Sequence, residues 1–256
     1  MSEHKSYVLS EMTWVMAREY FKKCDVALLP VGSTEQHGPQ NPLGTDHLVA
    51  YAIAKEVAKR CSVICLPPIP FGVSEHHKHF PGTIFISPSA FREYTMDVIK
   101  SLSYHGAKKI VVVNGHGGNL YSLIEVANRC RRDRIAFIVI FQWWESVRDM
   151  FPPDEMGHAG AIETSLNLFL HDHLVRMDQV VDEPVPQMRK IGFYFPIDTR
   201  DLTSSGVMGK ATTASKEKGE KAYTVAVDTL CKLVNRLKEI PFDKLIEHGV
   251  KSIKFE

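Results

Sequence analysis

Residues 26–49 of this chain read VALLPVGSTEQHGPQNPLGTDHLV. The run Val26–Val31 carries no polar side chain, which is typical of a strand buried on both faces of a sheet. A loop rich in glycine and proline follows, and from His47 to Arg60 the apolar residues recur at helical spacing. This stretch therefore predicts a buried strand that leads, through a polar loop, into a helix.

The same alternation of strand and helix patterns continues along the chain. Further buried strands are predicted at residues 62–66, 109–113 and 135–141. Helices are predicted at residues 87–105, 120–132, 161–170 and 215–240, with Ser87 and Asn119 as caps and Gly106 as a stop signal. Apolar strands that alternate with helices predict an α/β fold whose parallel sheet is covered on both faces. In such sheets, ligands bind beyond the carboxyl ends of the strands.

Composition limits the classes of protein to which the chain can belong. Its 256 residues include 31 basic and 30 acidic ones, so no basic surplus points to nucleic acid or to a membrane surface. We expect residues 1–256 to form one domain. The N-terminal residues do not resemble a signal peptide, and no apolar run approaches the ~20 residues that span a bilayer. The five cysteines form no CxxC pair, so we expect reduced thiols and a cytoplasmic protein.

Side chains that commonly bind metals follow three of the predicted strands. They are Glu35, His37, Asp46, His116, His158 and Glu163. Glu35 and His37 are two residues apart, so in an extended segment their side chains point the same way. Carboxylates and neutral imidazoles suit zinc, manganese or iron. Because the strand ends meet at one edge of the sheet, these residues together predict a metal site there.

Each of these residues also has an interpretation without a metal. A Glu-x-His pair in a loop is commonly a polar turn, and a histidine between glycines, such as His116, is commonly a turn residue. Asp46 is placed to cap the helix that follows it. These readings stay open for each residue singly, whereas the coincidence at several strand ends favours the metal.

Two other segments contain candidate substrate contacts. The run SEHHKHFPGT begins at Ser74 and includes His76, His77 and His79, and it is either a loop that faces a substrate or a solvated turn. Its candidate contacts are Ser74 and His79. In an extended pair, Trp143 and Trp144 point to opposite sides, so one ring can pack in the core while the other faces the pocket.

Five segments of the sequence resemble the creatininase (creatinine amidohydrolase) family. They are LLPVGSTEQHGPQNPLGTDH (28–47), HFPGTIFIS (79–87), VVVNGHGGN (111–119), GHAGAIETS (157–165) and GKATTASKEKGE (209–220). These segments span most of the chain and occur in family order. The resemblance implies a three-layer α/β/α sandwich with a mostly parallel central sheet, and a hydrolase with two metal ions.

The resemblance also implies individual roles. By motif match, Glu35 and His116 would bind one ion, His37 would bind the other, and Asp46 would bridge both. His158 would transfer protons, and Trp144 would form a wall for a flat substrate. The two divalent ions would be zinc, with manganese or iron as alternatives. The resemblance implies a homo-oligomer, with a hexamer as the form often found in the family.

Two positions depart from creatininase itself, whose corresponding motif resembles NGHYEN. The Glu of that motif, a metal ligand, is Gly118 here, so Glu163 becomes the candidate for the missing carboxylate. The Tyr, a neighbour of the substrate, is Gly117, which we therefore assign to the substrate side. The stretch FPPDEMGH before His158 also lacks the Trp that covers the substrate in creatininase. These differences argue against creatinine as the substrate while leaving the hydrolytic residues in place.

The leading functional hypothesis is a metal-dependent amidohydrolase that cleaves a non-peptide C–N bond of a small molecule, either a cyclic amide or a formamide. Related alternatives are a deformylase of a formylaminopyrimidine nucleotide in flavin or deazaflavin synthesis, a keto-inositol hydrolase, and an enzyme that trims a peptide cofactor precursor. A different class is a non-catalytic, metal-binding oligomeric scaffold. A nucleotide-binding module is disfavoured because the sequence contains neither GxGxxG nor GxxxxGK[ST].

Overall fold

Strand β1 (Val26–Val31) lies inside a four-stranded sheet, as its apolar sequence predicts. The computed structural model describes residues 6–185 and 195–253. The other strands are β2 (Ile64–Cys65), β3 (Lys109–Asn114) and β4 (Phe137–Gln142). The α-helices are α1 (Trp14–Phe21), α2 (Thr45–Cys61), α3 (Pro88–His105), α4 (Leu120–Arg132), α5 (Ala161–Leu170), α6 (Lys216–Glu239) and α7 (Phe242–His248).

The sheet has the order β2-β1-β3-β4, and all neighbouring strands are parallel. Val31, Asn114 and Gln142, the last residues of three strands, are aligned in register. The loops that follow these strands therefore leave the sheet at one edge. This arrangement confirms the prediction of a parallel sheet and brings the candidate site residues to a common place.

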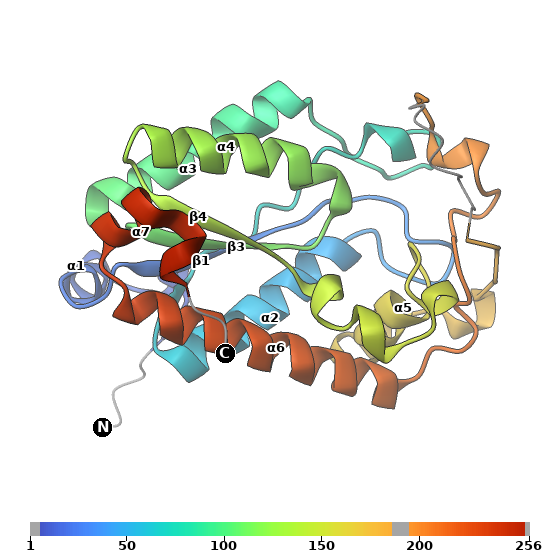
Figure 1. The fold of residues 1–256 in the computed structure, drawn as a ribbon. Coiled ribbons are helices and arrows are strands. Elements are labelled where there is room, and N and C mark those ends of the chain that lie inside the picture. The colour runs from blue at the N-terminus through green and yellow to red at the C-terminus, as the bar shows by residue number, and fades with distance from the viewer. Residues whose placement is uncertain (1–5, 186–194, 254–256) are drawn as a thin grey trace.

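Helices cover both faces of the sheet (Figure 1). On one face Leu28 and Val111 pack in a core with residues of α2 and α6, and on the other Leu29 and Val112 pack with residues of α3 and α4. Successive strand residues thus alternate between two apolar cores, which explains why these strands lack polar side chains. The structure confirms the three-layer α/β/α sandwich. Within the described ranges, no helix has the length and apolarity needed to cross a membrane.

Most local signals act as the sequence predicts. The Ser87 side chain accepts a hydrogen bond from the Ala90 amide and caps α3, and Gly106 ends that helix with a φ of 113°. The prediction that Asn119 caps α4 was wrong. Its side chain instead accepts from the Val73 amide and donates to the Gly32 carbonyl, so it joins three loops at the edge of the sheet.

Strand β2 is shorter than the predicted strand at residues 62–66. Ser62 adopts a left-handed conformation that ends α2, so the chain becomes extended only after it. The Cys65 amide then bonds to the Tyr7 carbonyl, and the Leu66 amide bonds to Leu28. Strand β2 is therefore only two residues long and lies at the edge of the sheet, where a single parallel bridge between Val8 and Cys65 flanks it on the side away from β1.

A buried lysine links the sheet to the end of α6. Lys109 Nζ donates to the carbonyls of Leu237 and Ile240 at 2.9 and 3.0 Å, and lies 2.9 Å from an Asp25 carboxylate oxygen. These carbonyls belong to the end of the helix, where intrahelical donors are lacking. We expect Lys109→Met, which keeps the apolar stem, to lower the free energy of unfolding by about 2–4 kcal/mol. Urea denaturation would measure this, with exposed Lys100→Met as a control expected to change it by less than about 0.5 kcal/mol.

Candidate metal centre

The six predicted metal-type residues converge at the carboxyl edge of the sheet. Glu35 and His37 lie in the loop after β1, and Asp46 lies in the first turn of α2. His116 follows β3, and Glu163 lies in the first turn of α5. Glu35, His37, Asp46 and His116 are all buried. Carboxylates and imidazoles gathered without solvent are costly to bury unless they share a cation or are paired with one another.

Their donor atoms form two sets that share Asp46. Glu35, Asp46 and His116 form the first set, and His37, Asp46 and Glu163 form the second, each with donor atoms within 4.8 Å of one another. His116 Nδ1 lies 3.1 Å from Glu35 Oε2 and 3.2 Å from Asp46 Oδ2. His37 Nε2 lies 2.9 Å from Asp46 Oδ1 and 3.8 Å from Glu163 Oε2. The two oxygens of Asp46 therefore face different sets.

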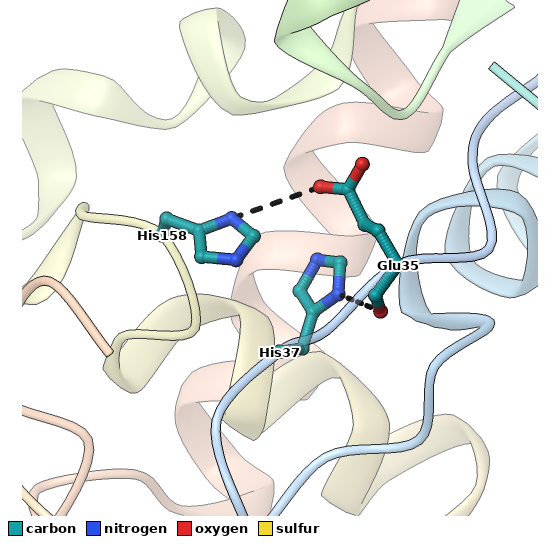
Figure 2. A group of neighbouring side chains, drawn as sticks. All are labelled: Glu35, His37 and His158. Atoms are coloured by element: carbon teal, nitrogen blue, oxygen red, sulfur yellow. Dashed lines mark hydrogen bonds and ion pairs between the residues drawn. The ribbon is translucent and has the colours of Figure 1, made fainter. Parts of the chain in front are cut away.

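A third set overlaps these two. Glu35, His37 and His158 also place donor atoms within 4.8 Å of one another. Figure 2 shows His158 Nδ1 directed towards the Glu35 carboxylate, at 4.0 Å, while the His37 ring lies beside it. The His37 and His158 ring centroids are 4.4 Å apart. The geometry thus allows His158 either to bind an ion or to stand next to one.

Backbone carbonyls determine which nitrogens of His37 and His116 are free to bind a metal. His37 Nδ1 lies 3.1 Å from the Glu35 carbonyl oxygen (Figure 2), and His116 Nε2 lies 3.0 Å from that of Val73. A carbonyl oxygen only accepts, so these two nitrogens carry protons. In the neutral rings, His37 Nε2 and His116 Nδ1 then turn lone pairs towards carboxylate oxygens. Such an arrangement is repulsive unless a proton or a metal ion lies between the groups.

The electrostatics of the cluster favour a bound cation. Burial alone would lower the pKa of His37, but Asp46, Glu163 and Glu35 together raise it to about 10. Burial raises the pKa of Glu163 to about 7 and also raises that of Glu35. For Asp46, burial opposes ionisation, yet His37 and His116 hold its pKa below the ordinary value. The carboxylates therefore need positive charge nearby.

Several atoms of the cluster form no well-aligned hydrogen bond among residues 6–185 and 195–253, although ring nitrogens lie within ion-pair distance of them. They are both carboxylate oxygens of Glu35, Oδ2 of Asp46 and Nε2 of His37. Buried polar atoms in proteins are almost always hydrogen-bonded, so such a group points to an ion. The donor set of carboxylate oxygens and neutral imidazole nitrogens fits zinc, manganese or iron.

The backbone at Gly118 leaves no room for the glutamate side chain that the resemblance to creatininase would place there. A Cβ added to Gly118 would lie 2.4 Å from His116 Nε2 and 2.4 Å from the Val73 carbonyl oxygen. These atoms belong to the hydrogen bond that orients His116, so a side chain here would disrupt it. Glu163 is the carboxylate that the fold brings to the second set instead. A Cβ on Gly117, by contrast, would meet no atom within 4 Å.

A cavity of about 260 Å³ reaches the cluster. Its lining combines metal-type residues with apolar and aromatic side chains, among them Trp143, Trp144, Met156 and Met208, and it includes Gly117. Trp143 is packed in the core and nevertheless reaches the cavity. Both tryptophans therefore line it, and not one of them alone as expected for an extended pair. No lysine or arginine of the described residues lines it.

The structure does not bring Ser74 and His79 to this cavity. Ser74 is buried, with Oγ 3.4 Å from the Ile84 carbonyl oxygen. It directly precedes the short 3₁₀ helix η2 (Glu75–His77). His79 is largely exposed and pairs with Asp198 at 2.8 Å. Neither residue is part of the lining.

The sequence patterns missed one residue at the site and left two others open. Gln36 is buried and contacts both His77 and His158 through its amide. No local pattern indicated this, because in an extended segment the Gln36 side chain is expected to point away from those of Glu35 and His37. His76 and His77, for which a substrate-facing loop or a solvated turn was expected, both line the cavity.

The sequence is similar to a known protein family over most of its length. The family model for creatininase, described as creatinine amidohydrolase, matches residues 10–234. The creatinine amidohydrolase of Pseudomonas putida is 34% identical over 246 residues, covering 87% of this chain and 94% of that protein. The 3-dehydro-scyllo-inosose hydrolase of Thermotoga maritima is 32% identical over 263 residues, covering 91% of this chain and 85% of that protein.

Solved structures extend the similarity to the whole fold. A manganese creatininase matches with a TM-score of 0.83 and 29% identity, covering 92% of this chain and all of that one. A creatininase with a Glu-to-Gln substitution, described as of Zn-Zn type, matches with a TM-score of 0.82 and 30% identity over 92% of this chain and all of that one. With the family model covering most of its length, the chain belongs to the creatinine amidohydrolase (creatininase) family of hydrolases.

Proposed function

We propose that this protein is a metal-dependent amidohydrolase that cleaves a non-peptide C–N bond of a small molecule, a cyclic amide or a formamide, with two divalent metal ions. The observation that carries the proposal is the pair of donor sets that share Asp46. Zinc is the expected metal, with manganese and iron as alternatives, and similar creatininases are described with zinc or manganese. We further expect a homo-oligomer, with a hexamer as the leading form, that works in the cytoplasm.

In this proposal each ion has its own ligands. Glu35 and His116 would hold the first ion, His37 and Glu163 would hold the second, and Asp46 would contribute to both. The Glu35 and Val73 carbonyls fix both imidazoles in the tautomer that binds a metal. When bound, two divalent ions supply an activated water and polarise the carbonyl that it attacks.

His158 is placed to move the proton that this reaction must transfer. It lines the cavity, and its Nδ1 lies 4.0 Å from Glu35 Oε1. Burial and the neighbouring His37 hold its pKa well below the ordinary value, so the ring begins the reaction neutral. A neutral imidazole can take a proton from water and pass it to the leaving nitrogen.

The cavity favours a small, uncharged substrate. Trp143 and Trp144 offer aromatic surface, which suits a flat molecule. Lys78 pairs with Asp198 and Lys210 with Asp154, and neither lines the cavity. These features argue against a phosphorylated substrate, such as that of a formylaminopyrimidine-nucleotide deformylase. Hydrolysis of a keto-inositol is the second candidate, because it too requires an uncharged pocket and because the Thermotoga maritima hydrolase is similar over 91% of this chain.

Metal content tests the proposal. We expect two ions per chain by elemental analysis in the wild type and about one in Glu163→Ala, because Glu163 belongs to the second set only. Glu125→Ala, an exposed substitution on α4, is the control and should keep both ions. One ion in both the wild type and Glu163→Ala would show that Glu163 is not a ligand.

Turnover is measured in parallel on a library of uncharged cyclic amides, formamides and keto-inositols. Hydrolysis of a cyclic amide or formamide by the two-metal protein would support the proposal, whereas hydrolysis of a keto-inositol alone would favour the second candidate. An absence of metal even after reconstitution would overturn the hydrolase assignment. Two metals without any turnover would favour the non-catalytic scaffold.

A further inference from the structure

The amide of Gln36 lies between two imidazoles of the site. Its Nε2 is 2.9 Å from His77 Nδ1, 2.9 Å from His158 Nε2 and 3.3 Å from the Gly206 carbonyl. Its Oε1 accepts from the Gly38 amide at 3.0 Å. A single side chain therefore contacts two rings that lie 4.6 Å apart, centroid to centroid.

The surroundings fix which way round this amide lies. The Gly38 amide can only donate and the Gly206 carbonyl can only accept, so Oε1 faces Gly38 and Nε2 faces the histidines. Packing holds the group in place, since a Cβ added to Gly206 would lie 1.8 Å from Gln36 Oε1. Gly206 also has a φ of 89°, which favours glycine. The donors of the amide are thus directed at fixed positions.

Hydrogen-bond counting then assigns a proton to each ring. His158 Nε2 lies 2.9 Å from the main-chain carbonyl oxygen of Gln36, which only accepts, so this nitrogen carries a proton. The two amide hydrogens of Gln36 are left for the Gly206 carbonyl and for His77 Nδ1. His77 Nδ1 is then an acceptor, and the His77 proton lies on Nε2, 3.3 Å from Glu35 Oε1.

The opposite assignment fails on the same contacts. If His158 Nε2 accepted from the Gln36 amide, its lone pair would face the main-chain carbonyl oxygen of Gln36 at 2.9 Å. In the assignment above, the His158 N–H is directed at that oxygen and the amide hydrogens at His77 and Gly206, so the 2.9 Å contact between the two nitrogens is not a hydrogen bond. If His77 were protonated at Nδ1, its N–H would point at the N–H of the Gln36 amide, and neither group could accept a hydrogen bond from the other. Thr199 Oγ1, 2.9 Å from His77 Nδ1, can donate or accept and decides nothing.

We infer that Gln36 is a positioning residue, whose side-chain amide fixes the tautomer of His77 and whose main-chain carbonyl fixes that of His158. His158 then presents an unprotonated Nδ1 on the side of Glu35, and His77 presents an N–H to the Glu35 carboxylate. The consequence for catalysis rests on the proposed function. Nδ1 of His158 takes the proton from water and gives it to the leaving nitrogen, and the ring returns to the tautomer in which it began.

Ring-nitrogen NMR of the wild type tests the inference directly. Protein labelled with ¹⁵N-histidine is recorded metal-free and after loading with zinc, and the signals are assigned with His77→Asn and His158→Asn. Both rings should be neutral and protonated at Nε2 in the zinc-loaded protein. A proton on Nδ1 of either ring would overturn the assignment. This readout does not depend on turnover, so it separates failure of the inference from failure of the proposed function.

Gln36→Glu tests the role of the amide, because it keeps the shape and replaces a donor by an acceptor. We expect the His77 proton to move to Nδ1 while His158 stays protonated at Nε2. Turnover should fall about 10–100-fold with the zinc content unchanged. The matched control is Gln40→Glu, a second buried glutamine in the same loop, whose amide donates to the Ala159 carbonyl and to Thr164. Its imidazole spectra should match the wild type.

An unchanged His77 tautomer in Gln36→Glu would overturn the role of Gln36. Should this variant not fold, Thr199→Val provides the test, since it removes the other neighbour of His77 Nδ1. With Gln36 intact, both tautomers should persist in Thr199→Val. A switch of His77 to Nδ1–H in that variant would show that Thr199, and not Gln36, sets the ring.

Discussion

Asp46→Asn should abolish tight binding of both metal ions and lower turnover by more than about 10³-fold, since loss of one donor from a hydrolytic site already costs about 10²–10³. The reason is that Asp46 is the only residue common to the two donor sets that flank it. Its Oδ1 faces His37 and its Oδ2 faces His116, so either set loses an anionic oxygen. Asparagine has the same shape but offers one neutral oxygen in place of two charged ones.

Two measurements check this expectation without relying on turnover. Elemental analysis should find less than one ion per chain in Asp46→Asn and two in the wild type. Zinc should raise the midpoint of thermal unfolding of the wild type, because a ligand that binds only the folded state stabilises it, and should do so far less in the variant. Asp97→Asn, an exposed carboxylate on α3, serves as the control. Retention of both ions in Asp46→Asn would show that Asp46 does not bridge them.

The fold could be predicted from the sequence because its signals are local. Val26–Val31 needs no polar side chain when both its faces are covered, and Ser87 and Gly106 mark the ends of α3 within a few residues. Asn119 misled the prediction since its partners, Gly32 and Val73, are distant in sequence. An asparagine that caps a helix and one that joins loops look the same in the sequence. They differ only in which backbone groups the fold places beside the side chain.

The same distinction applies to the candidate site. Glu35, His37, Asp46 and His116 were found because the carboxyl ends of parallel strands meet at one edge. Gln36 and His77 were not assigned, since their roles depend on contacts across 41 to 170 residues of sequence. The sequence shows that Gly118 lacks a carboxylate, but only the position of the Val73 carbonyl shows why no side chain fits there.

His158→Ala should lower turnover about 10²–10⁴-fold, the usual contribution of a general acid–base group, while the protein keeps both metal ions. The expectation follows from its place beside the two sets that share Asp46. Its Nδ1 is 4.0 Å from Glu35 Oε1, and its Nε2 is held by the Gln36 carbonyl. Added imidazole should restore part of the lost activity by filling the space that the ring leaves.

The competing role for His158 is that of a metal ligand, because it also forms a set with Glu35 and His37. The two roles differ in metal content, which a ligand would lower and a proton carrier would not. His76→Ala is a suitable control, since it removes a ring of the cavity lining that belongs to none of these three sets and, among their members, stacks only on His116, with centroids 5.6 Å apart. Loss of one ion in His158→Ala but not in His76→Ala would make His158 a ligand, and proton transfer would need another group. Full activity with both ions present would remove His158 from the reaction altogether.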